Sequence, residues 1–357
     1  MTMPNKKNLN LIALSFASAT IGAVLSILIY IASQNEPNQR ATTNVTTSSK
    51  PSEVLICEDF TMLREQHLSL VKPLLLLNND CESKALIPVK EKVRLLIDSM
   101  KSADMLSQAG VYFRELHSLN WTGVNYDKEF FPGSLMKVPL MINVLKAAET
   151  NPKLLEQKIP FDKKINTIIT ETPEIPLIPG SSYSVKELIM SMITDSNNDA
   201  TSMLFTINNK EKYDNLFSEL GLNTQQPEDL FYSISPADYS RFFRVLYNAT
   251  YLIHENSQFA MEILLKSRFK KGLTKYLPSY AKVAHKFGER YTSNDLTQFH
   301  EAGIIYSGDN PYLVVIMTEG KNHEQLIECV ARISKMLFNA HSKGFSSNTS
   351  EISPNKS

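Results

Sequence analysis

A serine and a lysine three positions apart, Ser134 and Lys137, stand at the start of an apolar helical run, FPGSLMKVPLM at 131–141. Residues three apart share one face of a helix, so these two side chains can meet. The lysine can then take the serine proton, and the serine oxygen can attack a carbonyl carbon. The S-x-x-K spacing alone is weak evidence, because the chain repeats it at Ser69, Ser267, Ser279 and Ser353.

Two further polar pairs follow this serine at a distance. Ser196 and Asn198 lie between two apolar helical segments, and Lys286 and Gly288 lie in a short strand-like run. Polar residues between helices can simply cap them, which is the plainer explanation of Ser196 taken alone. Folding that gathers a hydroxyl, an amide and a second ammonium group around the S-x-x-K serine would complete a site for acyl transfer.

The composition bounds the class of protein. The chain has 357 residues with 37 basic and 37 acidic side chains, and this balance argues against nucleic-acid binding. Hydrophobic residues make up 43% of the chain, which is enough for a substantial core. No Cys/His spacing resembles a metal site, so neither a metal nor another cofactor is expected.

The N-terminal stretch has the character of a membrane anchor. Residues 9–32 are almost continuously apolar, which is long enough for a helix that spans a bilayer. Lys6 and Lys7 precede this run, so the N-terminus is expected in the cytoplasm and the rest of the chain outside it. A cleaved signal peptide is the alternative, although its apolar run is usually shorter and ends at a small-x-small site. The polar residues 33–53 are predicted to be a flexible linker.

Three cysteines, Cys57, Cys81 and Cys329, all follow the predicted anchor. Disulfides persist outside the cytoplasm, so Cys57 and Cys81, which flank one segment, could pair. Cys329 lies in an apolar helical pattern and is expected to be a buried thiol. The segment 54–87, which contains the first two cysteines, is predicted to be helical and has no assigned role.

The remaining patterns indicate strands near both ends of the exported part and mostly helices between them. Strands are expected at 109–116, 120–125, 283–288, 299–306 and 312–317. Helices are expected at 89–105, 134–150, 236–252 and 323–339, and after a capping box at Ser184. The prediction is an α+β fold (α/β three-layer), in which helices and an all-helical subdomain flank one antiparallel sheet.

In order, the three motifs of this chain are S-L-M-K, S-N-N and K-F-G. The chain resembles the class A β-lactamase family and the wider serine hydrolases of the penicillin-binding fold, which carry S-x-x-K, S-D-N and K-T-G. The contexts match as well: a hairpin and Phe-Pro-Gly precede the first motif, the second lies between helices, and the third lies on a strand before a hairpin and a last helix. The resemblance covers about residues 88–340.

The resemblance implies chemical roles for the first two motifs. Ser134 would be the nucleophile, and Lys137 would accept its proton. A lysine can do so only if burial or a neighbouring cation lowers its pKa. Ser196 would relay a proton to the leaving amine, and Asn198 would hydrogen-bond the substrate amide and help to hold Lys137.

The third motif would bind the substrate. By resemblance, Lys286 would attract the substrate carboxylate, and Gly288 completes the motif. The backbone N–H groups of Ser134 and Glu289 would form the oxyanion hole, so the Glu289 side chain need not take part. His285, next to the lysine, is interpreted as a neighbour without a catalytic role.

Three departures from the family pattern bear on the substrate and on turnover. Asn197 replaces the Asp of the second motif, whose side chain points away from substrate in the family. Phe287 replaces a Thr whose hydroxyl helps to bind the substrate carboxylate. The omega-loop motif E-x-x-L-N is missing, and the available carboxylates, Glu228 and Asp229, are interpreted as a solvated turn. Acylation is therefore expected, and fast turnover of β-lactams is not.

The sequence predicts a membrane-anchored serine hydrolase of the class A β-lactamase type, which opens β-lactam or related amide bonds. A D-alanyl-D-alanine peptidase or esterase acting on cell-wall material is one alternative, and a non-catalytic penicillin or peptidoglycan sensor is another. The expected partners are a small-molecule β-lactam or cell-wall peptide and the membrane, without nucleic acid. A monomer is expected, with the hydrolase domain at 88–340 outside the cytoplasm, on the periplasmic or cell-surface side, and a polar tail at 341–357.

Overall fold

The computed structural model of the protein describes residues 60–66, 70–118, 120–164, 172, 175–223, 232–292 and 295–342. These residues all belong to the unit Ile56–Ser357. The predicted anchor and linker, the omega-loop candidates Glu228 and Asp229, and the polar tail lie outside the described residues. None of the helices in the described ranges combines the length and the apolar character that a bilayer span requires.

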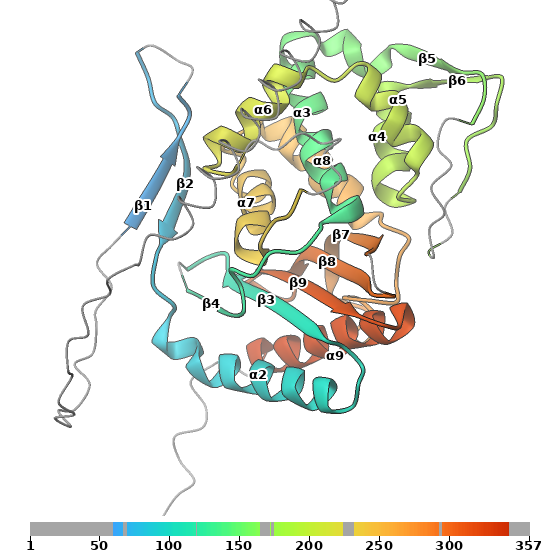
Figure 1. Ribbon diagram of the computed structural model, residues 1–357. Coiled ribbons are helices and arrows are strands. Elements are labelled where there is room, and N and C mark those ends of the chain that lie inside the picture. Colours follow the sequence, from blue (N-terminus) through green and yellow to red (C-terminus); the bar gives the residue numbers. More distant parts are fainter. Residues whose placement is uncertain are drawn as a thin grey trace, which may run out of the picture. The chain divides into compact units, whose positions relative to one another are not determined.

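The core of the structure is a five-stranded antiparallel sheet in the order β4-β3-β9-β8-β7 (Figure 1). Its strands are β3 (Gln108–Glu115), β4 (Trp121–Val124), β7 (Lys282–Tyr291), β8 (Thr297–Tyr306) and β9 (Tyr312–Gly320). The predicted hairpin and the three late strands join through the pairing of β3 with β9. Strand β7 forms one edge of the sheet, so its outer backbone groups face away from β8.

Helices cover both faces of this sheet, which confirms the predicted α+β architecture. On one face, α2 (Ile87–Ser102) packs with α9 (His323–Ser342), as Figure 1 shows. On the other face, α7 (Pro236–Tyr247) contacts β3 and β9 and connects the sheet to the helical part. The helical part contains α3 (Lys137–Thr150), α4 (Val185–Thr194), α5 (Asn198–Thr206), α6 (Lys210–Glu219) and α8 (His254–Leu265). Each face has its own apolar core, so the sheet is buried on both sides.

Local sequence signals account for several helix boundaries. The Ser184 hydroxyl accepts a hydrogen bond from the Glu187 N–H, and the Glu187 carboxylate accepts one from the Ser184 N–H. The predicted capping box is therefore confirmed. Pro88 lies in the first turn of α2, where its missing N–H costs nothing. Among the described residues there are also three short 3₁₀ helices: η1 (Lys84–Leu86), η2 (Gly133–Met136) and η3 (Pro152–Glu156).

The helical prediction for the segment 54–87 is wrong at 60–64 and 74–79, which are strands. Strands β1 (Phe60–Arg64) and β2 (Leu74–Asn79) form an antiparallel hairpin. A run of four leucines is too short to distinguish a helical period from a strand, and Pro73 directly before it disfavours a helix. Leu75 and Leu76 are buried, so their backbone N–H and C=O groups need hydrogen-bond partners, and pairing with strand β1 provides them.

A second small hairpin and the cysteines complete the fold. Strands β5 (Lys158–Phe161) and β6 (Ser181–Ser184) pair beside the helical part. Cys81 is disulfide-bonded, and its partner lies outside the described residues. Cys329 is a free, buried thiol on α9, as predicted, and burial raises its pKa to about 12. A thiol with so high a pKa is a poor nucleophile.

Candidate active site

The turn that carries Ser134, η2, lies against the outer edge of strand β7. Two glycines permit this approach. A Cβ atom added to Gly133 would lie 2.4 Å from the carbonyl oxygen of Glu289, and one added to Gly288 would lie 2.4 Å from that of Pro132. Gly133 also has φ of +53°, a conformation that other residues adopt at a cost. The glycine of the third motif therefore makes room for the half-buried serine of the first.

Side chains from the core hold this turn in place. The Tyr239 hydroxyl donates to the carbonyl of Leu135 at 2.7 Å. The N–H of Phe131 donates to Gln298 Oε1 at 3.0 Å, and its carbonyl lies 3.0 Å from His300 Nε2. Burial lowers the pKa of His300 to about 4, so the ring is neutral at physiological pH. Its Nδ1 accepts a backbone N–H from β9, which leaves Nε2 as the donor to Phe131.

Lys137, the first residue of α3, connects the first motif to the second. Its ammonium group donates to Ser196 Oγ at 3.1 Å, to the Ser196 carbonyl at 2.5 Å and to Asn198 Oδ1 at 2.8 Å. The side chain is only 4% exposed, so these polar partners replace the water that it loses. The structure therefore brings Lys137 of the first motif together with Ser196 and Asn198 of the second.

Ser196 lies in the break between α4 and α5 with a left-handed backbone, φ +57°. A left-handed serine is strained, and such strain persists only where neighbouring structure enforces it. Here Asn197 caps α5 by accepting the N–H of Ala200 at 2.7 Å, which ends the left-handed turn. The break thus supplies both a helix cap and a hydroxyl directed at the lysines.

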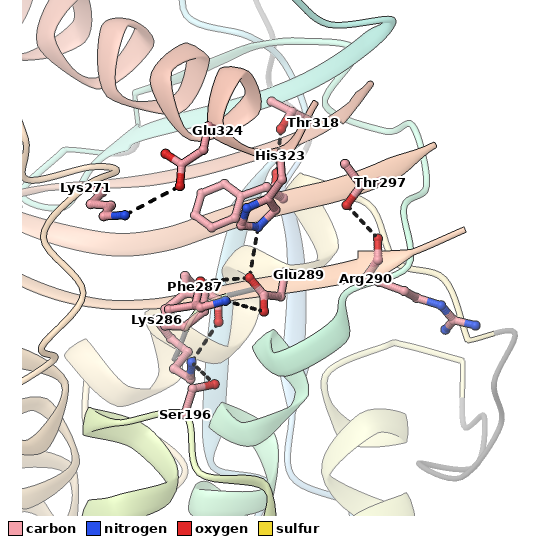
Figure 2. A network of polar contacts seen from close by, with 12 residues as sticks. Ser196, Lys271, Lys286, Phe287, Glu289, Arg290, Thr297, Thr318, His323 and Glu324 are labelled. Carbon is pink, nitrogen blue, oxygen red and sulfur yellow. Dashed lines mark hydrogen bonds and ion pairs between the residues drawn. The ribbon is translucent and has the colours of Figure 1, made fainter. Parts of the chain in front are cut away.

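Lys286 reaches the same hydroxyl from strand β7 (Figure 2). Its ammonium group donates to Ser196 Oγ at 2.9 Å and to the Phe287 carbonyl at 2.8 Å, and it lies 4.0 Å from the centroid of the Phe287 ring. The side chain is 0% exposed. Burial, reinforced by the charge of Lys137, holds the pKa of Lys286 well below its ordinary value. Ser196 Oγ therefore lies between two amines.

The outer edge of β7 also presents backbone groups to the nucleophile turn. The Phe287 carbonyl points outward, because it accepts from Lys286, and residues two apart on a strand have the same orientation. The N–H of Glu289 therefore points outward too, and it lies 3.2 Å from the position of a Cβ on Gly133. This is where the second N–H of the expected oxyanion hole was predicted.

The Glu289 side chain has partners that the sequence did not indicate. Its carboxylate accepts the Thr172 hydroxyl at 2.9 Å. It also lies 2.9 Å from His323 Nε2 at the start of α9, as Figure 2 shows. Burial alone would raise the pKa of Glu289, but the hydrogen bonds from His323 and Thr172 lower it below its ordinary value. No motif connects these three positions, so only the folded chain could reveal them.

A cavity of about 250 Å³ opens beside this cluster. Asp195, the neighbour of Ser196, lines one side, and Phe287, which covers Lys286, lines another. The other apolar lining residues are Ile175, Phe269 and Ile327, while Arg268, Lys270 and Lys271 are among the charged ones. The cavity is therefore lined by Asp195, directly before the second motif, and by Phe287 of the third motif.

Comparison with known proteins identifies the relatives of this arrangement. The sequence model of a family described as a beta-lactamase enzyme family matches residues 88–341. A β-lactamase structure from Chitinophaga pinensis is similar, with 22% identity, a TM-score of 0.62, and coverage of 70% of this chain and 99% of that one. A PBP-A mutant solved as an acyl-enzyme complex with penicillin G has 22% identity, a TM-score of 0.59, and coverage of 71% and 97%. The TLA-1 extended-spectrum β-lactamase has 17% identity, a TM-score of 0.61, and coverage of 70% and 98%.

These structural similarities establish the fold, because identities near 20% carry no information on substrate. Among curated proteins, none matches the chain. The geometry of the site and the family together therefore have to support any statement about function.

Proposed function

This chain belongs to the beta-lactamase enzyme family, and from that premise we propose a serine hydrolase that is acylated at Ser134. The observation that carries the proposal is the position of Ser196 Oγ, 3.1 Å from the Lys137 amine and 2.9 Å from the Lys286 amine. A hydroxyl between two buried amines can accept one proton while it gives up another, as acyl transfer requires. Ser196 lies in the second motif, directly after α4, and its neighbour Asp195 lines the cavity.

The proposed reaction begins with attack by Ser134 Oγ on a carbonyl carbon, which forms a C–O bond and passes the serine proton to Lys137 in its unprotonated form. The intermediate then collapses, and the bond from that carbon to the leaving nitrogen or oxygen breaks. The leaving atom takes a proton from Ser196 Oγ, and Ser196 regains one from the Lys137 ammonium. Water later attacks the acyl ester, releases the acid and returns a proton to Ser134 Oγ.

Backbone N–H groups would stabilise the oxyanion that develops during both attacks. The proposal assigns this role to the N–H groups of Ser134 and Glu289, because the outward edge of β7 adjoins the nucleophile turn. Removing one such donor from a preorganised oxyanion hole typically costs about 3 kcal/mol of transition-state stabilisation. The Tyr239, Gln298 and His300 contacts serve this step indirectly, because they fix the turn that carries the first N–H.

Labelling at one residue tests the proposal. The purified full-length chain is exposed to benzylpenicillin and, separately, to 4-nitrophenyl acetate, and intact mass is recorded over time. We expect one added acyl group per chain with at least one reagent, and none on Ser134→Ala. Ser279→Ala is the matched control, because Ser279 has the same S-x-x-K spacing but lies exposed, away from the described site. Labelling of Ser134→Ala at the wild-type rate would contradict the proposal.

The substrate class is proposed to be a β-lactam or a related cell-wall amide. The missing omega-loop glutamate favours slow release of the acyl group, and so a peptidase or penicillin sensor is the second candidate. The PBP-A acyl-enzyme with penicillin G supports the acylation half of this proposal, since it has the same fold. In the mass experiment, a stoichiometric burst without turnover favours the second candidate, and rapid multiple turnover favours a β-lactamase.

We also propose that residues 9–32 anchor the chain in the cell membrane. The hydrolase domain is then a monomer outside the cytoplasm. The support is the length of the apolar run and the lysines before it. Fractionation of expressing cells tests it, since the anchored chain should sediment with membranes until detergent is added. Recovery of the intact chain in the soluble fraction would exclude the anchor.

A further inference from the structure

The Lys286 ammonium has no room for a substrate carboxylate. It is 0% exposed, one hydrogen bond goes to Ser196 Oγ and another to the Phe287 carbonyl, and the Phe287 ring covers it at 4.0 Å. An ammonium group has three N–H donors, so these two acceptors and the aromatic face account for all of them. A carboxylate could approach only by displacing the ring.

Phe287 is fixed in that position by an aromatic cluster. Its ring lies 4.5 Å from the ring of Phe269 and stacks on that of Phe299 at 6.1 Å, and the side chain is only 4% exposed. The residue also lines the cavity, whereas Lys286 does not. Phe287 therefore separates the buried amine from the cavity.

The charges around the cavity give little further help to a carboxylate near Ser196. Arg268 lies 3.0 Å from the carboxylate of Asp195, and Lys271 lies 3.5 Å from that of Glu324. The rim cations are thus paired, apart from the exposed Lys270. On the strand itself, the next side chain with the orientation of Phe287 is the carboxylate of Glu289, which would repel an acid.

We propose, on the basis of the serine-hydrolase function above, that Phe287 is a specificity-determining residue. Among the β-lactams and related amides or esters of the proposed function, it favours those whose leaving group carries no carboxylate next to the scissile bond. The leaving group contacts the Phe287 ring with an apolar or uncharged surface, and Lys286 acts on Ser196 Oγ and not on the substrate. The physical reason is desolvation, because a carboxylate placed against this ring would lose water and gain no hydrogen bond.

A matched pair of substrates tests the selection. Benzylpenicillin and its methyl ester differ only in the charge next to the scissile amide. We expect the full-length wild-type chain to be acylated by the ester about tenfold faster than by the acid, a difference typical of one unpaired buried charge. Phe287→Thr should remove the cover from Lys286 and shift this ester-to-acid ratio toward the acid by about tenfold.

Ile175→Ala is the control, because Ile175 lines the same cavity but is exposed, lies outside the aromatic cluster and does not cover Lys286. Its ratio should stay at the wild-type value, and the ratio itself cancels losses due to partial unfolding. Equal rates for ester and acid in the wild type, faster reaction of the acid, or an unchanged ratio in Phe287→Thr would overturn the inference alone. No labelling of the wild type by either compound would overturn the inference, and no labelling by 4-nitrophenyl acetate as well would overturn the proposed function.

Discussion

Strand β7 buries a titratable side chain on each of its two faces, and the partners of the two side chains differ in kind. Lys286 faces the site, where its partners are a hydroxyl, a carbonyl and an aromatic ring. His285 faces α9, where its Nδ1 lies 2.5 Å from the carboxylate of Glu301, and both side chains are 0% exposed. The second oxygen of Glu301 accepts the N–H of Leu273, so this acid also holds the chain after α8.

The comparison distinguishes a buried side chain with a proposed functional role, Lys286, from a buried pair with a structural role, His285 and Glu301. Glu301 compensates its neighbour and binds a backbone group, so removal of the acid leaves polar groups without partners. Lys286 has no carboxylate among its hydrogen-bond partners, and its lowered pKa records the cost of its position. A protein that keeps such a group does so for its chemistry, because an apolar side chain of the same size would be at least as stable there.

The largest expected effect follows from replacing the functional charge. Lys286→Met should slow acylation of Ser134 by about a thousandfold, because Ser196 loses the amine that orients its hydroxyl. The free energy of unfolding should stay the same or rise, because the variant no longer buries an ammonium group. Acylation rates from intact mass and urea unfolding curves measure the two quantities on one preparation.

Lys282→Met is the control for that variant, since Lys282 begins the same strand but is exposed. It should change neither acylation nor stability. A Lys286→Met variant that is acylated at the wild-type rate, or that loses several kcal/mol of stability, would remove the distinction between the two faces.

The opposite result is expected on the structural face. Glu301→Ala should lower the free energy of unfolding by about 3–4 kcal/mol, because it leaves a buried histidine and a buried N–H without their acceptor. The fraction that remains folded should still be acylated within a few-fold of the wild-type rate. Urea unfolding, with acylation measured at low temperature, checks both parts, and a catalytic loss that exceeds the loss of folded protein would contradict the assignment.

A smaller effect, on the pH dependence of stability, is expected from His300 on the neighbouring strand β8. His300 is buried on β8 and neutral, with a pKa of about 4 against 6.5 for an ordinary histidine. Between these values the unfolded chain binds a proton that the folded chain does not, so the stability from this group is complete above pH 6.5 and falls with the pH. The expected loss between pH 6.5 and 4 is about 3 kcal/mol.

His300→Gln keeps a donor for the Phe131 carbonyl and removes the titrating group. The difference in unfolding free energy between wild type and variant should therefore shrink as the pH falls from 6.5 to 4, in urea titrations at each pH. His117→Gln, at an exposed histidine, is the control and should show no such trend. A constant difference across this range would contradict the prediction, because it would mean that His300 binds a proton as readily in the folded protein as in the unfolded chain.

Part of the fold could be derived from local patterns. Helix starts at Pro88 and Ser184 depend on groups within one turn, and the strand runs near both ends have their own alternation. The hairpin at 60–79 could not be derived, because a short leucine run takes the structure that its tertiary partner completes. The pairing of β3 with β9 joins residues about two hundred positions apart, which no local pattern encodes.

The sequence by itself determined which chemical groups are available, in three ordered motifs that include Gly288. It also determined the helix and strand signals around them. Only the tertiary structure decided where those groups point. Lys286 turns around the edge of its strand to Ser196, Phe287 covers it, and Glu289 is held by Thr172 and His323. Residue types and spacing restrict the possible chemistry, but burial and orientation depend on contacts between distant segments, and these determine which partner each charge meets.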